Sequence, residues 1–547
     1  MILDAKIVND DFSSEYSETY HGFHNELGRY ESMRFVLRLR PDLHKALKST
    51  GAGIRFAKLS DINFEAFQAF STYLHETIHW WQHIGSTSGL ILSLSSPLQT
   101  HINFQDLNLF LNNIGPIKPI LKYSEVNSEH GLNTKDDVII NSILNNHHDI
   151  EFFKYFVISP EKVEQFSKNP FFESVGHSFH ITYSSFISLL ASSFDKNLEF
   201  LPDTRRWPEH YRKLRDQKAQ DYYYGSPIGI PPLGIKEIYE GQARFSQIQY
   251  LNLGGDGELT WDNLKECGML EGVYYKGFDI FINTIDATLP HEVDTSLVGL
   301  YLLILDIAIN PMTGFPFDIE DFGRFRIHTD PGLRFLSLCE TVRDKCPELK
   351  SFIKNHSAAE YFHASSELCK HLGFPTPIDG ANRICKWADE QEALIELMKE
   401  EKTFEFSLEN QPIRLIFSRY IRFLQDKAKN PEFFCWPGIY TTGDKCTPNY
   451  ITLFDEHQAL FSDDEDGDIY PKRFKDKDDI RVSQAFDEFY VSIVNYDLVR
   501  QWVIETGEFK YDFFWLTSKY SLEDGKKWAI SNFENMIGIS PESFEIL

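Results

Sequence analysis

The sequence has few cysteines, and their spacing does not indicate a disulfide framework. The 547 residues include 7 Cys, all from position 267 onward, and no Cys-x-x-Cys pair occurs. An odd number of unpaired cysteines excludes a small disulfide scaffold and is typical of a reducing compartment. We therefore predict a cytoplasmic protein.

Long hydrophobic runs are also missing. The longest, 297–305, ends at Asp306, about half of the roughly 20 residues that a membrane-spanning helix needs. The first residues carry neither a basic segment nor the apolar core of a signal peptide. These absences predict a protein without a membrane partner, in which 297–305 forms a buried helix.

Positive charge is in short supply. Lys and Arg number 54 against 81 Asp and Glu, so the formal net charge is −27. Such a surface repels phosphate backbones and anionic lipid. The most basic stretch, 205–218, is interrupted by Glu209 and Asp216, and we interpret it as solvated surface. We predict no nucleic-acid partner.

Three common catalytic or nucleotide-binding motifs do not occur. The chain has no GxxxxGK[ST], no GxGxxG and no GxSxG. Nothing therefore indicates a nucleotide hydrolase, a dinucleotide-binding enzyme or a serine esterase. Hydrophobic residues nevertheless make up 42% of the chain and aromatic residues 15%, which is enough apolar surface for a large folded core.

One strong motif is present, His-Glu-Thr-Ile-His at 75–79, inside a segment with helical hydrophobic periodicity. Residues four apart lie on one helix face, about 6 Å apart along the axis, so His75 and His79 can bind one ion. The adjacent Glu76 can hydrogen-bond a water on that ion and remove its proton. The motif predicts one Zn²⁺ per chain, with His75 and His79 as ligands and Glu76 as general base.

A catalytic zinc needs a third protein ligand, and Glu240 is the best candidate. It lies in EIYEGQARFSQ, a second helical segment. The HETIH motif followed by a helical Glu-Gly-x-Ala resembles the gluzincins, zinc metallopeptidases of the zincin class related to thermolysin. The resemblance covers only these two stretches. It implies Glu240 as third ligand and a peptide or protein substrate.

Two features depart from the gluzincin pattern. The stretch between the two motifs is longer than gluzincins usually show, which requires a large insertion. Arg244 stands where thermolysin-like enzymes carry an Asp that orients a ligand histidine, so that carboxylate must come from elsewhere. Arg244 could instead bind a substrate carboxylate, although an ordinary salt bridge is the preferred interpretation.

Other residues are weaker candidates for the same site. Glu237 is the second choice for third ligand, whereas His83 could reach the ion only if the helix broke. Zincins often use a distant side chain to stabilise the oxyanion, and His328 and Tyr239 are candidates for that role. Glu173, His177 and His180 share a predicted helix face, which we interpret as core or surface rather than as a metal site.

These motifs predict an α+β, predominantly helical fold with a zincin-like catalytic core. Residues 1–60 form a β-containing portion with strands near 32–39 and 53–59, and residues 61–345 form the catalytic domain with a long insertion at about 100–230. A helical region follows over 346–428. An irregular segment and a C-terminal α or α+β region occupy 429–547.

Two other functions remain open. The chain could be a non-catalytic, zincin-like metal-binding module with a regulatory protein partner. It could also be a di-iron carboxylate oxidase, because both Glu76 and His79 and the pair Glu360 and His363 have the Glu-x-x-His spacing used in such bundles.

Overall fold

The computed structural model describes residues 27–32, 34–49, 63–129, 136–474, 476–513 and 521–547. Helices account for 67% and strands for 4%, which confirms the predominantly helical α+β class with a small N-terminal sheet. The strand predicted near 53–59 lies outside the described residues. Within them, no helix combines the length and the apolar character that crossing a membrane requires.

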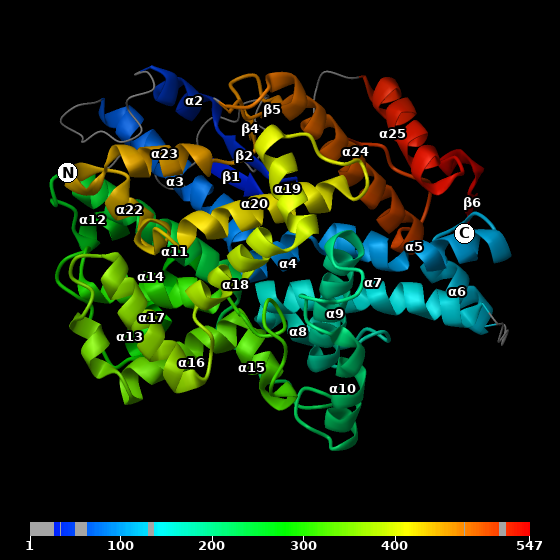
Figure 1. Cartoon of the computed structure of the whole chain (residues 1–547), viewed down its shortest axis with the longest axis horizontal. Helices are drawn as coiled ribbons and strands as arrows, with labels where there is room; N and C mark the ends of the chain where they lie inside the picture. Colours follow the sequence, from blue (N-terminus) through cyan, green and yellow to red (C-terminus); the bar gives the residue numbers. More distant parts are fainter. Residues whose placement is uncertain (1–26, 33, 50–62, 130–135, 475, 514–520) are drawn as a thin grey trace.

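The main sheet joins segments from the two ends of the chain (Figure 1). Its strands, in spatial order, are β1 (Gly28–Glu31), β2 (Val36–Leu39), β4 (Phe461–Asp463) and β5 (Ile469–Pro471). β2 pairs antiparallel with β1 and parallel with β4, with Val36 opposite Phe461. Two strands assigned to the N-terminal portion are therefore completed by a hairpin from the C-terminal region.

Helix α3 (Phe64–Gly85) carries the HETIH motif through the interior. It begins at Asn63, whose side chain accepts a hydrogen bond of 2.7 Å from the Glu65 N–H and so caps the helix. Apolar and small residues recur around most of its circumference, and 17 of its 22 residues are buried. Such a helix is held by packing on all sides, which fixes the direction of its histidines.

Helix α11 (Ile235–Gly254) packs against α3 and is also almost entirely buried. Its first turn is closed by a capping box in which the Glu237 carboxylate accepts from the Gly234 N–H. Gly241 faces Tyr301 of α14 (Ser296–Ala308), and a Cβ at this position would collide with the tyrosine hydroxyl. The glycine of the Glu-Gly-x-Ala stretch thus lets two helices approach closely. Helix α14, the predicted buried helix, is confirmed as buried.

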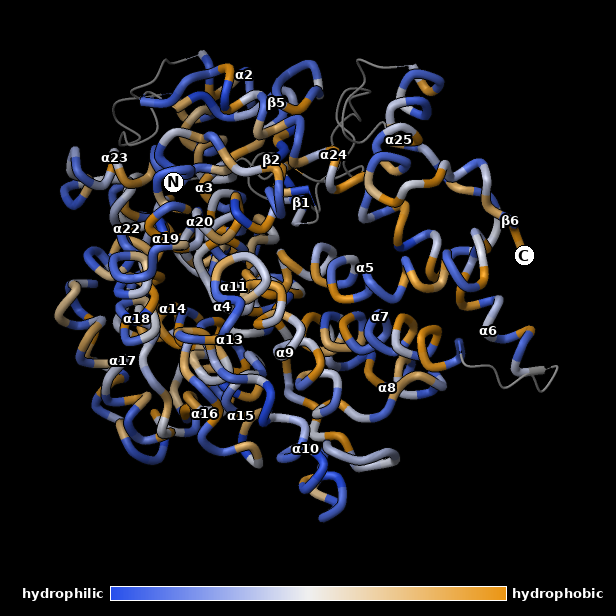
Figure 2. The backbone as a smooth tube through the Cα atoms, turned by 45° about the vertical axis from the view of Figure 1, so that its right-hand side comes forward, coloured by the Kyte–Doolittle hydropathy of each residue, from blue (hydrophilic) through white to orange (hydrophobic). Residues whose placement is uncertain are grey.

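The long insertion between the two motifs is a mainly helical layer beside α3 and α11, drawn from blue through cyan to green in Figure 1. Its helices are α5 (Ser95–Asn113), α6 (Ile120–Glu129), α7 (Asp137–Ile158), α8 (Val163–Phe166), α9 (Val175–Phe194) and α10 (Trp207–Asp216). The basic stretch falls on α10, which is mostly hydrophilic in Figure 2. Side chains such as Arg205 and Lys213 are exposed there, as expected for solvated surface.

The C-terminal region packs on both the sheet and the insertion. Helix α24 (Asp479–Ile504) places Phe489 and Tyr490 against Phe461 of β4 and continues alongside α5. Helix α25 (Leu522–Ile537) lies beside α24. A short parallel pair, β3 (Ile117–Lys118) with β6 (Glu545–Ile546), ties the insertion to the last described residues.

Most of the remaining helices lie in the lower and central parts of Figure 1, with α2 at the top and α23 at the upper left. They are α2 (Pro41–Lys48), α4 (Thr87–Ser93), α12 (Trp261–Glu266), α13 (Val273–Thr284), α15 (Phe325–Thr329), α16 (Pro331–Asp344), α17 (Ala358–Leu372), α18 (Pro377–Glu390), α19 (Glu392–Thr403), α20 (Gln411–Lys427), α21 (Pro431–Cys435), α22 (Pro437–Tyr440) and α23 (Pro448–Glu456). The segment 429–475, for which irregular structure is predicted, contains α21–α23 and the β4–β5 hairpin. Prolines that suggest a break stand instead in first helical turns, where the missing N–H is not needed.

Candidate metal centre

The structure brings His75, His79 and Glu240 together between α3 and α11. Their facing atoms form a nearly equilateral triangle: the two Nε2 atoms are 3.1 Å apart, and each is 3.3 Å from Glu240 Oε2. Within the described residues, these are the one group of three His, Cys, Asp or Glu side chains whose ligand atoms converge. All three were candidate ligands in the sequence.

The triangle has the dimensions of a tetrahedral zinc site. A tetrahedral ion with bonds of about 2.0–2.1 Å separates its ligand atoms by about 3.3 Å. The observed sides of 3.1, 3.3 and 3.3 Å match this value. Two imidazoles and one carboxylate also form a ligand set that leaves a fourth position open, as catalytic zinc sites do. The residues present therefore fit a zinc ion in donor type, number and spacing.

The electrostatics of the cluster favour a cation. Burial lowers the pKa of His75 to about 4, so this imidazole is neutral at pH 7. Burial opposes the charged form of His79 as well, but the charge and hydrogen bond of Glu240 outweigh it and raise the pKa of His79 to about 9. The histidines in turn hold the pKa of the Glu240 carboxyl, whose side chain is 26% exposed, well below its usual range. A bound metal would replace the proton on His79 beside the ionised Glu240.

The Glu76 side chain extends from helix α3 to β1, the edge strand of the main sheet. Its side chain is only 4% exposed, and its charge helps to raise the pKa of His79. A Cβ on Gly28 of β1 would come within 2.8 Å of Glu76 Cγ and 3.0 Å of its Oε1. Glycine at position 28 therefore allows the strand to pass directly against the proposed general base.

Gln82 fixes the orientation and the tautomer of His79. Its Oε1 lies 2.8 Å from His79 Nδ1, while its Nε2 donates to the Tyr239 carbonyl and to Gln242 Oε1, both at 2.9 Å. A backbone carbonyl can only accept, so the amide nitrogen must face Tyr239 and the amide oxygen must face the imidazole. His79 then donates from Nδ1, which leaves Nε2 as the nitrogen that faces the triangle and would bind a metal in place of its proton. The carboxylate that gluzincins place behind a ligand histidine is here an amide.

We expect Gln82→Leu to weaken zinc binding by about 10- to 100-fold, because supporting partners of ligand histidines contribute on that scale. Competition with a chromophoric chelator measures the change. Gln68→Leu is the matched control, since Gln68 is also a buried glutamine of α3 but its side-chain amide makes no hydrogen bond to the ligands. Equal zinc affinity in the two variants would contradict the positioning role of Gln82.

Of the three candidates for oxyanion or substrate binding, Arg244 and Tyr239 lie near the cluster. Arg244 donates to Gln247 Oε1 at 2.7 Å and stacks over the ring of Tyr274, 4.0 Å from its centroid. The Tyr274 ring in turn meets the His75 ring edge-on at 6.1 Å. Arg244 thus adds a positive charge beside His75, whose pKa it helps to lower.

The side chains of Tyr239 and His328 contact residues other than the three ligands. The Tyr239 hydroxyl is 3.5 Å from the Gln82 carbonyl, and its ring packs against His83. His328 lies in α15, where its ring contacts Phe374 and its pKa is lowered to about 4 by burial and the nearby Arg324 and Arg334. It is not part of the triangle.

The alternative ligands have other partners. Glu237 caps α11 and pairs with Lys276 at 2.9 Å. His83 follows one turn after His79 on an unbroken helix, and its ring packs between Tyr30 and Tyr239.

The residues of the other two candidate metal clusters are engaged elsewhere. Glu360 accepts the cap hydrogen bonds of α17, and His363 packs on Phe352. His177 bonds to Asp149, whereas His180 stacks on Tyr211. The structure does not bring Glu360 and His363 to the His75 cluster, as a di-iron centre built on both pairs requires.

Sequence reasoning missed Gln82, Tyr274 and Gly28. Gln82 carries a readable signal, because a polar residue three positions after a ligand histidine shares its helix face. Tyr274 and Gly28 reach the site through tertiary packing and leave no local pattern. No protein-family model, curated protein or solved structure matches the chain.

Proposed function

We propose that this chain is a zinc-dependent metallopeptidase of the zincin class. The observation that carries the proposal is the ligand triangle of His75, His79 and Glu240, which has the spacing of a tetrahedral zinc site and a carboxylate, Glu76, next to its first histidine. A site that only stabilised the fold would need the ligands but not an adjacent base. The gluzincin resemblance of the two motifs agrees with this assignment.

Each residue of the site would have a separate role in peptide-bond hydrolysis. Zinc held by the three ligands would polarise the scissile carbonyl and make a bound water acidic. Glu76 would accept the proton of the attacking water and return it to the leaving amine. The Arg244 guanidinium, stacked on Tyr274 beside His75, would supply positive charge for the carbonyl oxygen as its negative charge develops.

Two histidines and one carboxylate also bind iron in oxygenases that leave several positions open. Glu76 separates the two possibilities, because an oxygenase has no use for a general base beside its first ligand whereas a hydrolase requires one. The same argument favours an enzyme over a non-catalytic metal-binding module.

Metal content and peptide cleavage test the proposal together. Elemental analysis of the purified protein should give one zinc per chain, and the loaded protein should cleave members of a broad peptide library. Iron in place of zinc would contradict the proposed class. Stoichiometric zinc without any cleavage would instead support a binding module.

A further inference from the structure

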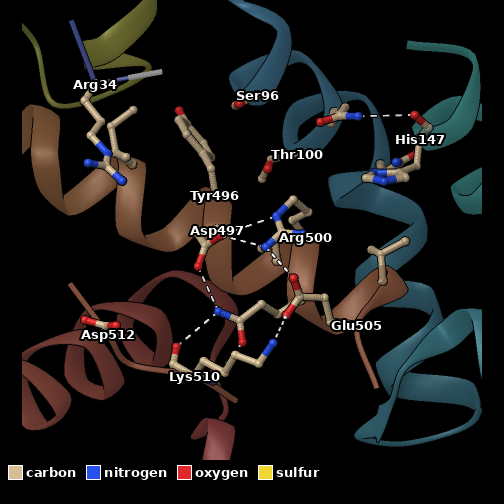
Figure 3. A pocket seen from close by; sticks show the side chains of 16 residues that line it. Arg34, Ser96, Thr100, His147, Tyr496, Asp497, Arg500, Glu505, Lys510 and Asp512 are labelled. Carbon is tan, nitrogen blue, oxygen red and sulfur yellow. Dashed lines mark hydrogen bonds and ion pairs between the residues drawn. The ribbon is translucent and has the colours of Figure 1, made fainter. Parts of the chain in front are cut away.

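A polar cavity lies away from the ligand triangle, between the insertion and the C-terminal helices. It has a volume of about 280 Å³ and is walled by α5 and α7 on one side and by α24 with the segment after it on the other. Figure 3 shows Ser96, Thr100 and His147 facing Tyr496, Asp497 and Arg500 across it. None of these residues belongs to the metal centre.

The α5 wall is polar at helical spacing. Ser96, Gln99, Thr100 and Asn103 recur at intervals of three and four residues, so they share one face of the helix. The side-chain amides of Gln99 and Asn103 already have partners on α7, because they donate to the backbone carbonyls of His147 and Ile143. Helix faces packed against other helices are usually apolar, so a face of this kind needs polar partners in the space it borders.

His147 supplies an independent sign of a ligand. Its side chain is 3% exposed and borders the cavity, yet its Nε2 has no hydrogen-bond partner among the described residues. Burial lowers the pKa of His147 to about 4, so the ring is neutral at pH 7 and its free nitrogen either accepts or donates. Leaving such an atom unpaired in the interior is unfavourable, and a bound molecule with hydroxyl groups would give it a partner.

Most of the charged side chains that line the cavity are paired, including Arg34 with Glu31 at 2.9 Å, whereas Asp512 is exposed. Arg500 pairs with Asp497 at 3.0 Å and with Glu505 at 2.7 Å, and Lys510 pairs with Glu505 at 3.3 Å. An anionic ligand would have to break one of these pairs to gain a partner. The groups left for a ligand are the hydroxyls on the α5 face, the Tyr496 hydroxyl, the imidazole and the exposed Asp512 carboxylate, which can accept from ligand hydroxyls.

We propose that this cavity binds an uncharged polyhydroxylated molecule of about the size of one hexose ring. Hydroxyl, phenol and imidazole groups match ligand hydroxyls because each donates or accepts. The volume holds about nine waters at roughly 30 Å³ each, which a molecule of about twelve non-hydrogen atoms displaces. The proposal does not depend on the metal centre or on peptidase activity.

Titration calorimetry of the full chain tests the ligand class. The probes are D-glucose, D-galactose and myo-inositol, with L-alanine and acetate as zwitterionic and anionic comparisons. At least one of the first three should bind saturably with a Kd below about 1 mM. No saturable binding by any of them, or tighter binding of alanine or acetate, would overturn the proposal; a cavity that holds only water gives the first of these results.

Variants test the location. Thr100→Val removes one hydroxyl with little change of shape, and His147→Phe removes the free nitrogen; each should weaken binding at least about tenfold, the loss of one good hydrogen bond. His148→Phe is the matched control, because the neighbouring His148 stacks on Phe171 and does not line the cavity. If His147→Phe does not fold, the affinity of Thr100→Val alone tests whether the ligand binds in this cavity. Unchanged affinity in Thr100→Val would place the ligand elsewhere.

Discussion

Glu76→Gln should leave zinc bound at one per chain while reducing peptide cleavage by about 10²- to 10⁴-fold, the usual contribution of a general base. Glutamine has nearly the shape of glutamate, so it keeps the close packing of this side chain against Gly28. It cannot accept a proton from the attacking water, and the loss therefore falls on kcat rather than on metal binding. The measurement is kcat/KM on a library-derived peptide, with zinc determined on the same sample.

Glu65→Gln is the control for this experiment. Glu65 lies in the first turn of the same helix, where it is exposed and far along the chain from the ligands. This variant should keep wild-type activity. If Glu76→Gln retained full activity with zinc in place, Glu76 could not be the base, and the hydrolytic assignment would fail even though the metal site stood.

The helices that build the site were predictable because their signals are local. A capped segment with regular apolar spacing specifies α3, and the four-residue spacing of His75 and His79 places both rings on one face whatever the rest of the chain does. The same holds for α14, whose continuous apolar run requires burial on all sides.

The main sheet was only partly predictable. Its strands are three or four residues long, and Val36 pairs with Phe461 across more than four hundred intervening positions. Strands this short leave almost no alternating pattern, and pairing at that separation is decided by the packing of α24 and α3 rather than by neighbouring residues. The sequence therefore suggested a β portion within residues 1–60, whereas the chain closes its sheet with a C-terminal hairpin.

The metal centre was likewise predictable only where its residues carry a local sequence signal. The two histidines follow from spacing alone, but Glu240 was chosen through a family resemblance, because nothing local brings α11 to α3. The support of His79 by Gln82 depends on the carbonyl of Tyr239, which fixes the direction of the amide. A hydrogen-bond network that crosses two helices can be read only once their packing is known.

Removing a ligand should abolish high-affinity zinc binding. His79→Ala and Glu240→Ala each open one corner of the triangle, and each should weaken zinc binding by more than about 100-fold, beyond the range of supporting partners such as Gln82. Elemental analysis after dialysis should then find far less than one zinc per chain. Because an ion bound only to the folded state stabilises it in proportion to the logarithm of its concentration over Kd, zinc should raise the Tm of the wild type but not of these variants.

His83→Ala is the matched control for both ligand variants. It removes a histidine from the same face of α3, one turn beyond His79, and it costs packing against Tyr30 and Tyr239. We expect a lower Tm but one zinc per chain and a full zinc-induced shift. Metal loss equal to that of His79→Ala would show that any damage to this helix empties the site. Stoichiometric zinc in a His75→Ala/His79→Ala double variant would instead place the metal elsewhere, and the triangle between α3 and α11 would be a hydrogen-bonded cluster without a metal.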